Sequence, residues 1–88
     1  MRRGGAKIDS SLKRRLEEAP EAKVRLILRT KGDPGRYRPL LTERGIRVKR
    51  ELGLLKALAI ESEASQALAL LRERWVLSIE EDREVRTL

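Results

Sequence analysis

The chain of 88 residues contains no cysteine, no histidine and no phenylalanine. Without cysteine it has neither a disulfide to stabilise it nor a thiolate to bind a soft metal. Without histidine it lacks the side chain that most often acts as a general base or a metal ligand. Because no nucleophile and base stand at a recognised spacing either, we expect a protein that is not an enzyme and that holds no cofactor and no metal.

Long apolar runs and aromatic residues are also scarce. No segment approaches the roughly 18 consecutive apolar residues of a membrane helix, so no membrane partner is expected. The basic start of the chain is not followed by the apolar stretch of a secretory signal. The only aromatic residues are Tyr37 and Trp75, which bears on nucleic-acid binding below.

The net charge of +7 is unevenly distributed along the chain. Residues 1–50 hold 16 Lys and Arg against 6 Asp and Glu, or +10, whereas residues 51–88 hold 5 against 8, or −3. A basic half favours an anionic partner, either nucleic acid or an acidic protein surface. A solvated surface rich in Arg and Glu accounts for the same pattern without any partner, and it is the default explanation.

Hydrophobic periodicity and turn residues predict three helices and four strands. Asp9 or Ser10 can cap the first helix, Gly45 can end the second, and Ser62 can cap the third. Pro39 is awkward inside a helix, so the second helix either starts near Pro39 or is distorted from Pro34 onward. The predicted elements are a helix over 9–18, a strand over 23–31, a turn over 32–35 with a helix after it that ends at Arg44, strands over 46–52 and 54–61, a helix over 63–74 and a strand over 76–81. The predicted core positions on these elements are Leu12, Leu16, Val24, Leu26, Leu28, Leu40, Leu41, Ile46, Val48, Leu58, Ile60, Ala64, Ala67, Leu68, Leu71 and Trp75.

After the first helix, the order is β-α-β-β-α-β, which predicts an α+β, ferredoxin-like domain. In this fold, two interlocked β-α-β halves form a four-stranded antiparallel sheet with two helices on one face. The other face of the sheet stays open and is the expected docking surface. Strand alternation places on it Arg25, Ile27, Arg29, Arg47, Lys49, Ala57 and Ala59.

Nucleic acid and a metal are two candidate ligands for such a domain. RNA-binding domains of this topology stack bases on aromatic side chains of the two central strands, and here those strands carry none. Basic side chains alone would support weak, salt-sensitive binding, so a nucleic-acid-binding module is the less favoured alternative. Glu80, Glu81 and Asp82 could chelate a hard cation, but successive strand residues point to alternate faces and do not converge.

Four segments, in order, carry a resemblance to a known family: KVRLILRTKGD, LTERGIRVKREL, LLKALAIE and VLSIEEDREVRTL. Residues 23–88 resemble the propeptides of subtilisin-like serine proteases and the related propeptide-like protease inhibitors. The last segment matches the V-x-x-V/I-E-x-D pattern of that family with Val76, Ile79, Glu80 and Asp82. The chain differs from the family where Lys56 replaces an Asn, and also at Pro39 and Trp75.

The resemblance implies a protease inhibitor that is also a folding chaperone for its protease. The open sheet face would pack on two parallel helices of a subtilisin-like serine protease, and Glu80 and Asp82 would cap the N-termini of those helices. Glu81 would point to the other side. The tail would bind the active-site cleft like a cleavage product, with the positions P4 to P1 filled by Val85, Arg86, Thr87 and Leu88.

The resemblance divides the chain into an extension over 1–22, an inhibitor domain over 23–83 and an inhibitory tail over 84–88. We expect the free chain to be a monomer. The protease that it binds could be part of the same polypeptide (in cis) or a separate protein (in trans). A processed propeptide would be secreted or periplasmic, whereas a stand-alone inhibitor without a signal peptide would be cytoplasmic. The sequence decides neither this choice, nor the identity of the protease, nor the role of the extension, nor whether Leu88 is a natural cleavage site.

Overall fold

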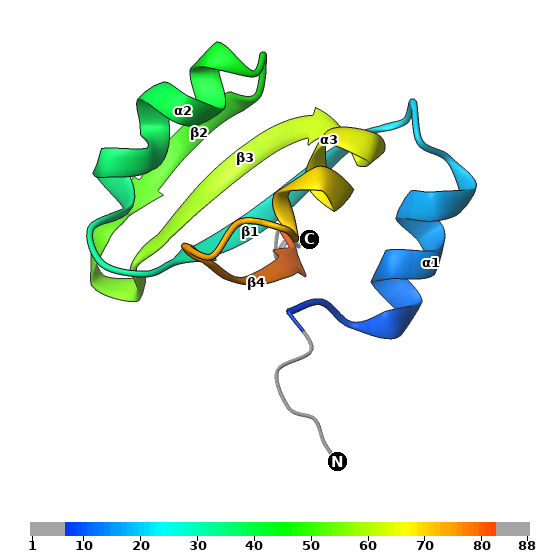
Figure 1. Ribbon diagram of the computed structural model, residues 1–88, viewed down its shortest axis with the longest axis horizontal. Coiled ribbons are helices and arrows are strands. Elements are labelled where there is room, and N and C mark those ends of the chain that lie inside the picture. Colours follow the sequence, from blue (N-terminus) through cyan, green and yellow to red (C-terminus); the bar gives the residue numbers. More distant parts are fainter. Residues whose placement is uncertain (1–6, 83–88) are drawn as a thin grey trace, which may run out of the picture.

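The structure is a computed structural model that describes residues 7–82, so the predicted tail residues Val85, Arg86, Thr87 and Leu88 lie outside the described range. The predicted order of helices and strands is confirmed (Figure 1). In chain order the elements are α1 (Ser10–Glu18), β1 (Lys23–Thr30), a 3₁₀ turn (Pro34–Tyr37), α2 (Arg38–Glu43), β2 (Arg47–Leu52), a second 3₁₀ turn (Gly53–Leu55), β3 (Ala57–Glu63), α3 (Ala64–Leu70) and β4 (Val76–Glu81).

The four strands form one antiparallel sheet in the order β2-β3-β1-β4. The two strands next to each other in the middle, β3 and β1, are therefore not consecutive in the chain. This is the strand order of the ferredoxin-like fold, in which each β-α-β half crosses over a strand of the other half. The fold class predicted from the sequence is confirmed.

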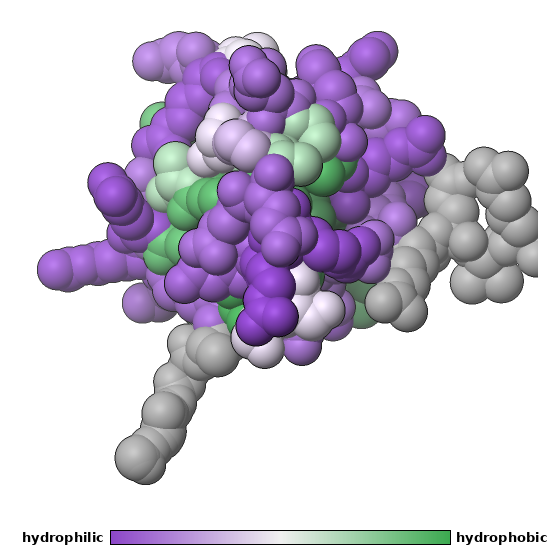
Figure 2. Space-filling view, turned by 90° about the vertical axis from the view of Figure 1, so that its right-hand side faces the viewer, coloured by the Kyte–Doolittle hydropathy of each residue, from purple (hydrophilic) through white to green (hydrophobic). Residues whose placement is uncertain are grey.

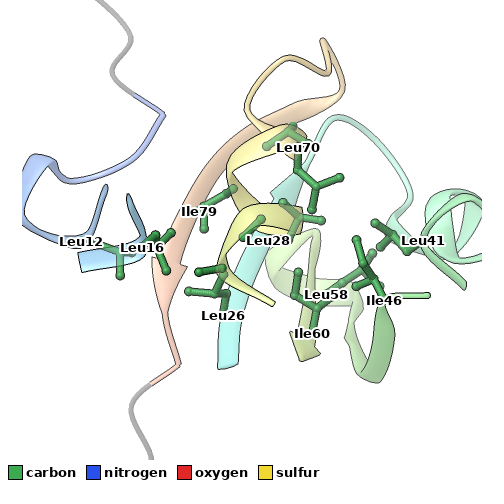
Figure 3. Close-up of a cluster of buried hydrophobic side chains, with 13 residues drawn as sticks. Leu12, Leu16, Leu26, Leu28, Leu41, Ile46, Leu58, Ile60, Leu70 and Ile79 are labelled. Atoms are coloured by element: carbon green, nitrogen blue, oxygen red, sulfur yellow. The ribbon is translucent and has the colours of Figure 1, made fainter. Parts of the chain in front are cut away.

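The hydrophobic core lies between the sheet and the helices. Figure 3 shows Leu12 and Leu16 on one side of this core and Leu41 and Ile46 on the other, with residues of the sheet between them. The strand residues in the core alternate along β1 and β3, as expected for a sheet with one covered face, whereas in β4 a shift in the register with β1 separates Val76 from Ile79 by three positions. They are Leu26, Leu28, Leu58, Ile60, Val76 and Ile79, each at most 1% exposed.

The first two helices begin and end where local chemistry predicts. Asp9 caps α1 by accepting a hydrogen bond from the backbone N–H of Leu12 at 3.1 Å. Pro39 lies in the first turn of α2, so α2 is short and Pro34 starts a separate 3₁₀ turn. Gly45, with φ +77°, follows α2 in the left-handed conformation that a glycine adopts readily. The prediction that Leu40 joins the core is wrong, because only Leu41 of this short helix faces the sheet and Leu40 is 44% exposed.

The third strand and the third helix differ from the prediction at their boundaries. Gly53–Leu55 forms a 3₁₀ turn rather than the start of a strand, and Lys56 leaves it with φ +50°. The strand β3 then continues through Ser62, which is buried, so the N-cap of α3 is Glu63 instead. Gln66 accepts a hydrogen bond from the backbone N–H of Glu63 at 2.9 Å, as in a capping box.

The helix α3 is also shorter than predicted and turns a different residue to the sheet. It ends at Leu70, which is fully buried, while Leu68 and Leu71 are only partly buried. Trp75 was predicted to extend the apolar stripe of this helix, but it lies in the loop before β4 and packs against the edge of the core. Within residues 7–82, no helix is long and apolar enough to cross a membrane.

Candidate protein-binding face

The open face is the side of the sheet opposite the core, and the strand register defines its residues. Each open-face residue lies opposite a neighbour on the next strand whose side chain points the same way. None of the helices in residues 7–82 lies over this side. The open face consists of Arg47, Arg50 and Leu52 on β2, Ala57, Ala59 and Glu61 on β3, Arg25, Ile27 and Arg29 on β1, and Ser78 and Glu80 on β4.

Charge differs in sign between the two edge strands of the open face, while the inner strands β1 and β3 carry arginine and glutamate respectively. The edge strand β2 contributes the cations Arg47 and Arg50, whereas the opposite edge strand β4 contributes the carboxylate of Glu80. The row between Arg50 and Glu80 is apolar, because Ala59 and Ile27 occupy its two central positions. A partner that is complementary to this face would therefore present donors or positive charge toward β4 and acceptors or negative charge toward β2.

Two ion pairs join neighbouring strands on the open face. The Nε atom of Arg29 donates to Oε2 of Glu80 at 3.1 Å, and both side chains are about half exposed. Nη1 of Arg47 lies 3.9 Å from Oε1 of Glu61, with the arginine side chain 77% exposed. Pairs this exposed add little to stability, since water already solvates both charges. Their effect is to hold long side chains in place over the sheet.

The structure corrects one expectation for the two alanines of the open face. Ala57 and Ala59 lie opposite Arg29 and Ile27, two other residues predicted for the open face. However, they are 0% and 1% exposed, so these two residues of the expected docking surface are not accessible in the free domain. A methyl group between longer neighbours is easily covered, and a partner that reaches it must first displace those side chains.

The strand β2 departs from strict alternation at Lys49. The pairing of β2 with β3 shifts between Val48 and Arg50, which leaves Lys49 as an extra residue with no partner in the register. Arg50, rather than Lys49, lies opposite Ala59. A bulge of this kind bends an edge strand and discourages pairing with another chain.

The bulge also explains why Arg50 and Leu52 were missed as open-face residues. Strict alternation from Val48 would place Arg50 in the core, where an unpaired charge is very costly. That conflict was a usable signal that the alternation breaks inside this strand. With the bulge at Lys49, the half-buried Leu52 moves to the open face, and Glu51 moves to the other side, where it pairs with Arg38 of α2 at 2.9 Å.

The three consecutive acids at the end of β4 are separated by the pleat of the strand. Glu80 lies opposite Ile27 on the open face, whereas Glu81 lies opposite Leu26 on the covered side. There Glu81 accepts two hydrogen bonds from the guanidinium group of Arg15, at 3.0 and 3.3 Å. This carboxylate raises the pKa of Arg15, mainly through the hydrogen bonds. Glu80 and Glu81 therefore act on opposite sides of the sheet, as alternation predicts.

The position of Asp82 relative to the open face differs from that of Glu80. Its backbone N–H donates to the carbonyl of Arg25 at 3.1 Å, so the ladder extends one step past β4. Asp82 also lines a groove of about 250 Å³ between α1 and β1, together with Leu16 and Lys23. The structure thus places Glu80 on the open face and Asp82 at the end of the sheet. Among residues 7–82, no group of three or more acidic side chains is arranged to hold a metal ion.

The two aromatic residues of the chain lie away from the open face. Tyr37 and Trp75 stack on each other with ring centroids 4.2 Å apart and planes 4° from parallel. The hydroxyl of Tyr37 donates to the carbonyl of Lys31 at 2.8 Å, which fixes the ring at the end of β1. These rings are already engaged with each other and with the core, and so are not a platform for bases on the open face.

The side of the molecule on which α1 lies is shown as a surface in Figure 2. Figure 2 shows a small group of apolar side chains near the middle of this side, surrounded by hydrophilic ones. The groove beside α1 is lined by apolar residues such as Leu12 and Val24 and by charged ones such as Arg15 and Asp82.

The sequence matches no protein-family model and no curated protein.

Proposed function

We propose that this domain is a propeptide-like inhibitor and folding chaperone of a subtilisin-like serine protease. In this proposal, the open face packs on two helices of the protease and the segment after β4 enters the active-site cleft. The observation that carries the proposal is the position of Glu80, an exposed carboxylate at the acidic edge of an uncovered sheet face. It stands just before the tail segment that resembles a product-like inhibitor.

The chemistry of Glu80 suits the end of a helix. The N-terminus of a helix presents N–H groups without intrahelical partners and a partial positive charge, and a carboxylate satisfies both. Within residues 7–82, Arg29 donates to Oε2 of Glu80 and no hydrogen bond to Oε1 is found, so Oε1 could accept from N–H groups of a partner. Arg29 then keeps the carboxylate oriented, so that less side-chain freedom is lost on binding.

The tail supplies the second contact in this proposal. Residues 83–88 lie outside the described structure, and the resemblance to the propeptide family would put Val85 at P4 and Leu88 at P1. An extended segment that adds to a strand of the protease gains backbone hydrogen bonds, and alternate side chains fill pockets. Leu88 and Val85 suit large apolar pockets. Linking the tail to a docked sheet raises its effective concentration at the cleft, so two weak contacts together give a tight complex.

The proposal is tested by titrating the full chain into a subtilisin-type protease and following peptide hydrolysis. We expect inhibition at or below micromolar concentration. Glu80→Ala should raise the inhibition constant roughly 5- to 150-fold, as for the loss of a charge-assisted hydrogen bond. Glu81→Ala is the matched control, because it removes the same group one residue away on the opposite side of the sheet. Deleting Val85–Leu88 should weaken inhibition more than either substitution.

Two results would contradict the proposal. One is the absence of inhibition across a panel of subtilisin-type proteases at micromolar concentrations. The other is an equal effect of Glu80→Ala and Glu81→Ala, since the open face would then have no special part in binding. Retention of DNA or RNA in a mobility-shift assay at about 50 mM salt, without protease inhibition, would favour the nucleic-acid-binding alternative.

A further inference from the structure

The segment before β1 holds α3 at both of its ends. The ammonium group of Lys7 donates to the carbonyls of Leu71 at 3.1 Å and Glu73 at 2.7 Å, just past the end of α3. At the start of α3, the N–H groups of Ala64 and Ser65 donate to the carbonyls of Ala22 and Pro20, each at 2.9 Å. A helix of seven residues is too short to be stable alone, and these contacts satisfy end groups that would otherwise lack partners.

The same segment fills a corner of the hydrophobic core. Leu12 and Leu16 of α1 are 6% and 2% exposed and belong to the cluster of core residues that contains Leu26 and Ile79. Figure 3 shows both leucines beside β4, at the end of the core away from α2. Without α1, this end of the core would face water. A domain of this size buries a smaller fraction of its surface than a larger domain does, so the loss of two core leucines would remove a large part of its stability.

The outer edge of β4 is covered by the same segment as well. Ile8 pairs with Ile79 in a parallel bridge, and the N–H of Ile79 donates to the carbonyl of Lys7 at 2.7 Å. The ion pair between Arg15 and Glu81 then joins α1 to the last residue of β4. An uncovered edge strand is a site for pairing with other chains, so this cover also protects the free domain from aggregation.

We infer that residues 7–22 are a clamp that keeps the domain folded before it meets a protease, so that it binds as a preformed inhibitor. The part of this inference that concerns binding rests on the proposed function, and the part that concerns folding does not. A domain without such a clamp would fold only on the protease surface and would lose part of the binding free energy to ordering. A preformed inhibitor avoids that loss and spends little time in the open state that a protease can cut.

The folding part is tested by urea unfolding of the free full-length chain. We expect one cooperative transition for the unmodified chain. Leu16→Ala should raise the equilibrium constant for unfolding at least about 30-fold, because it empties a core position on the clamp. The matched control is Leu40→Ala, the same substitution on α2 at a side chain that is 44% exposed, and it should change that constant less than about threefold. Equal effects of the two substitutions, or an unmodified chain without a cooperative transition, would overturn the inference.

The binding part is tested by calorimetry with a subtilisin-type protease at several temperatures. The unmodified chain and Leu40→Ala should bind with the same heat-capacity change. Leu16→Ala should bind with a more negative one, because part of it folds during binding. If the unmodified chain already shows the signature of coupled folding, the preformed-inhibitor inference is wrong. If no variant binds, the proposed function fails, while the urea experiment still decides whether residues 7–22 are a clamp.

Discussion

The two faces of the sheet are built from neighbouring residues but differ in the interactions of their side chains, which are apolar contacts on one face and exposed ion pairs on the other. On the covered face, Leu28 and Ile60 lie in a core without charged groups and are fully buried. On the open face, Arg29 and Glu61 lie one residue away in sequence and are held by exposed ion pairs. Burial of apolar surface is worth more than an exposed ion pair, so the covered face dominates stability. Substitutions on the open face should therefore cost less stability than those on the covered face.

The largest expected effect comes from truncating adjacent residues on opposite faces. Leu28→Ala should lower the free energy of unfolding by about 2–5 kcal/mol, because it leaves a cavity in the core. Ile27→Ala, on the open face, should lower it by about 1 kcal/mol or less, because Ile27 is only half-buried. Urea unfolding followed by circular dichroism measures both. Similar losses for the two variants would show that the open face is buried in solution, for instance by self-association.

A smaller effect of opposite sign is expected at the turn between β2 and β3. Lys56 has φ +50°, the left-handed conformation, which costs a residue with a Cβ roughly 1–2 kcal/mol. Asparagine tolerates this conformation better, so Lys56→Asn should raise the free energy of unfolding by about 0.5–1 kcal/mol.

Lys56→Ala is the control for this prediction, because it removes the charge and the long side chain but keeps the strain. It should not stabilise the domain. If both variants gain the same stability, the lysine side chain rather than the backbone conformation is responsible. Since Lys56 is exposed, neither variant disturbs the core.

The smallest expected effect is a change in stability at acidic pH. It concerns an ion pair on the helix side of the sheet. Arg44 donates to Glu73 at 2.8 Å and thereby holds the pKa of Glu73 below its ordinary value. A carboxyl group with a lowered pKa in the folded state stabilises the protein above its unfolded pKa. That contribution is lost as the pH falls through the lowered pKa of the folded state, on the acid side of the ordinary glutamate pKa.

The measurement is the midpoint of thermal unfolding as a function of pH. Glu73→Gln should flatten the decline of that midpoint in acid, and Arg44→Ala should flatten it to a similar extent, because either change removes the pair. An unchanged acid slope in both variants would mean that the pair adds nothing to stability in solution. Comparing the slope with that of Glu80→Gln would show whether ion pairs on the two faces differ.

Local sequence patterns predicted most of the fold. They failed where contacts with a neighbouring strand override the alternation of a strand or the usual role of a residue type. The alternation of Val24, Leu26 and Leu28 identified β1 and its covered face correctly. The bulge at Lys49 was missed because the register of an edge strand depends on its neighbour β3. The buried Ser62 was mistaken for a helix cap, because its residue type suits a cap whether or not the strand continues through it.

The candidate site was predicted less completely than the fold. Alternation alone separates Glu80 from Glu81, and the register confirms that they lie on opposite sides. The partners Arg29 and Arg15, however, come from β1 and α1, which are 51 and 66 residues away along the chain. Which cation meets which acid depends on the strand order and on the packing of α1. Those are long-range contacts, and a pattern of neighbouring residues does not contain them.

By itself, the sequence determined the hydrophobic repeats that distinguish helices from strands. It also determined the acidic end of β4 and the absence of histidine and cysteine. These follow from residue type and spacing, which act over a few neighbours. Only the tertiary structure decided that the alanines of the open face are covered and that residues 7–22 hold α3 and β4 in place. Both depend on side chains that meet across the sheet or around its edge. Their burial is settled by the packing of the whole domain rather than by local preference.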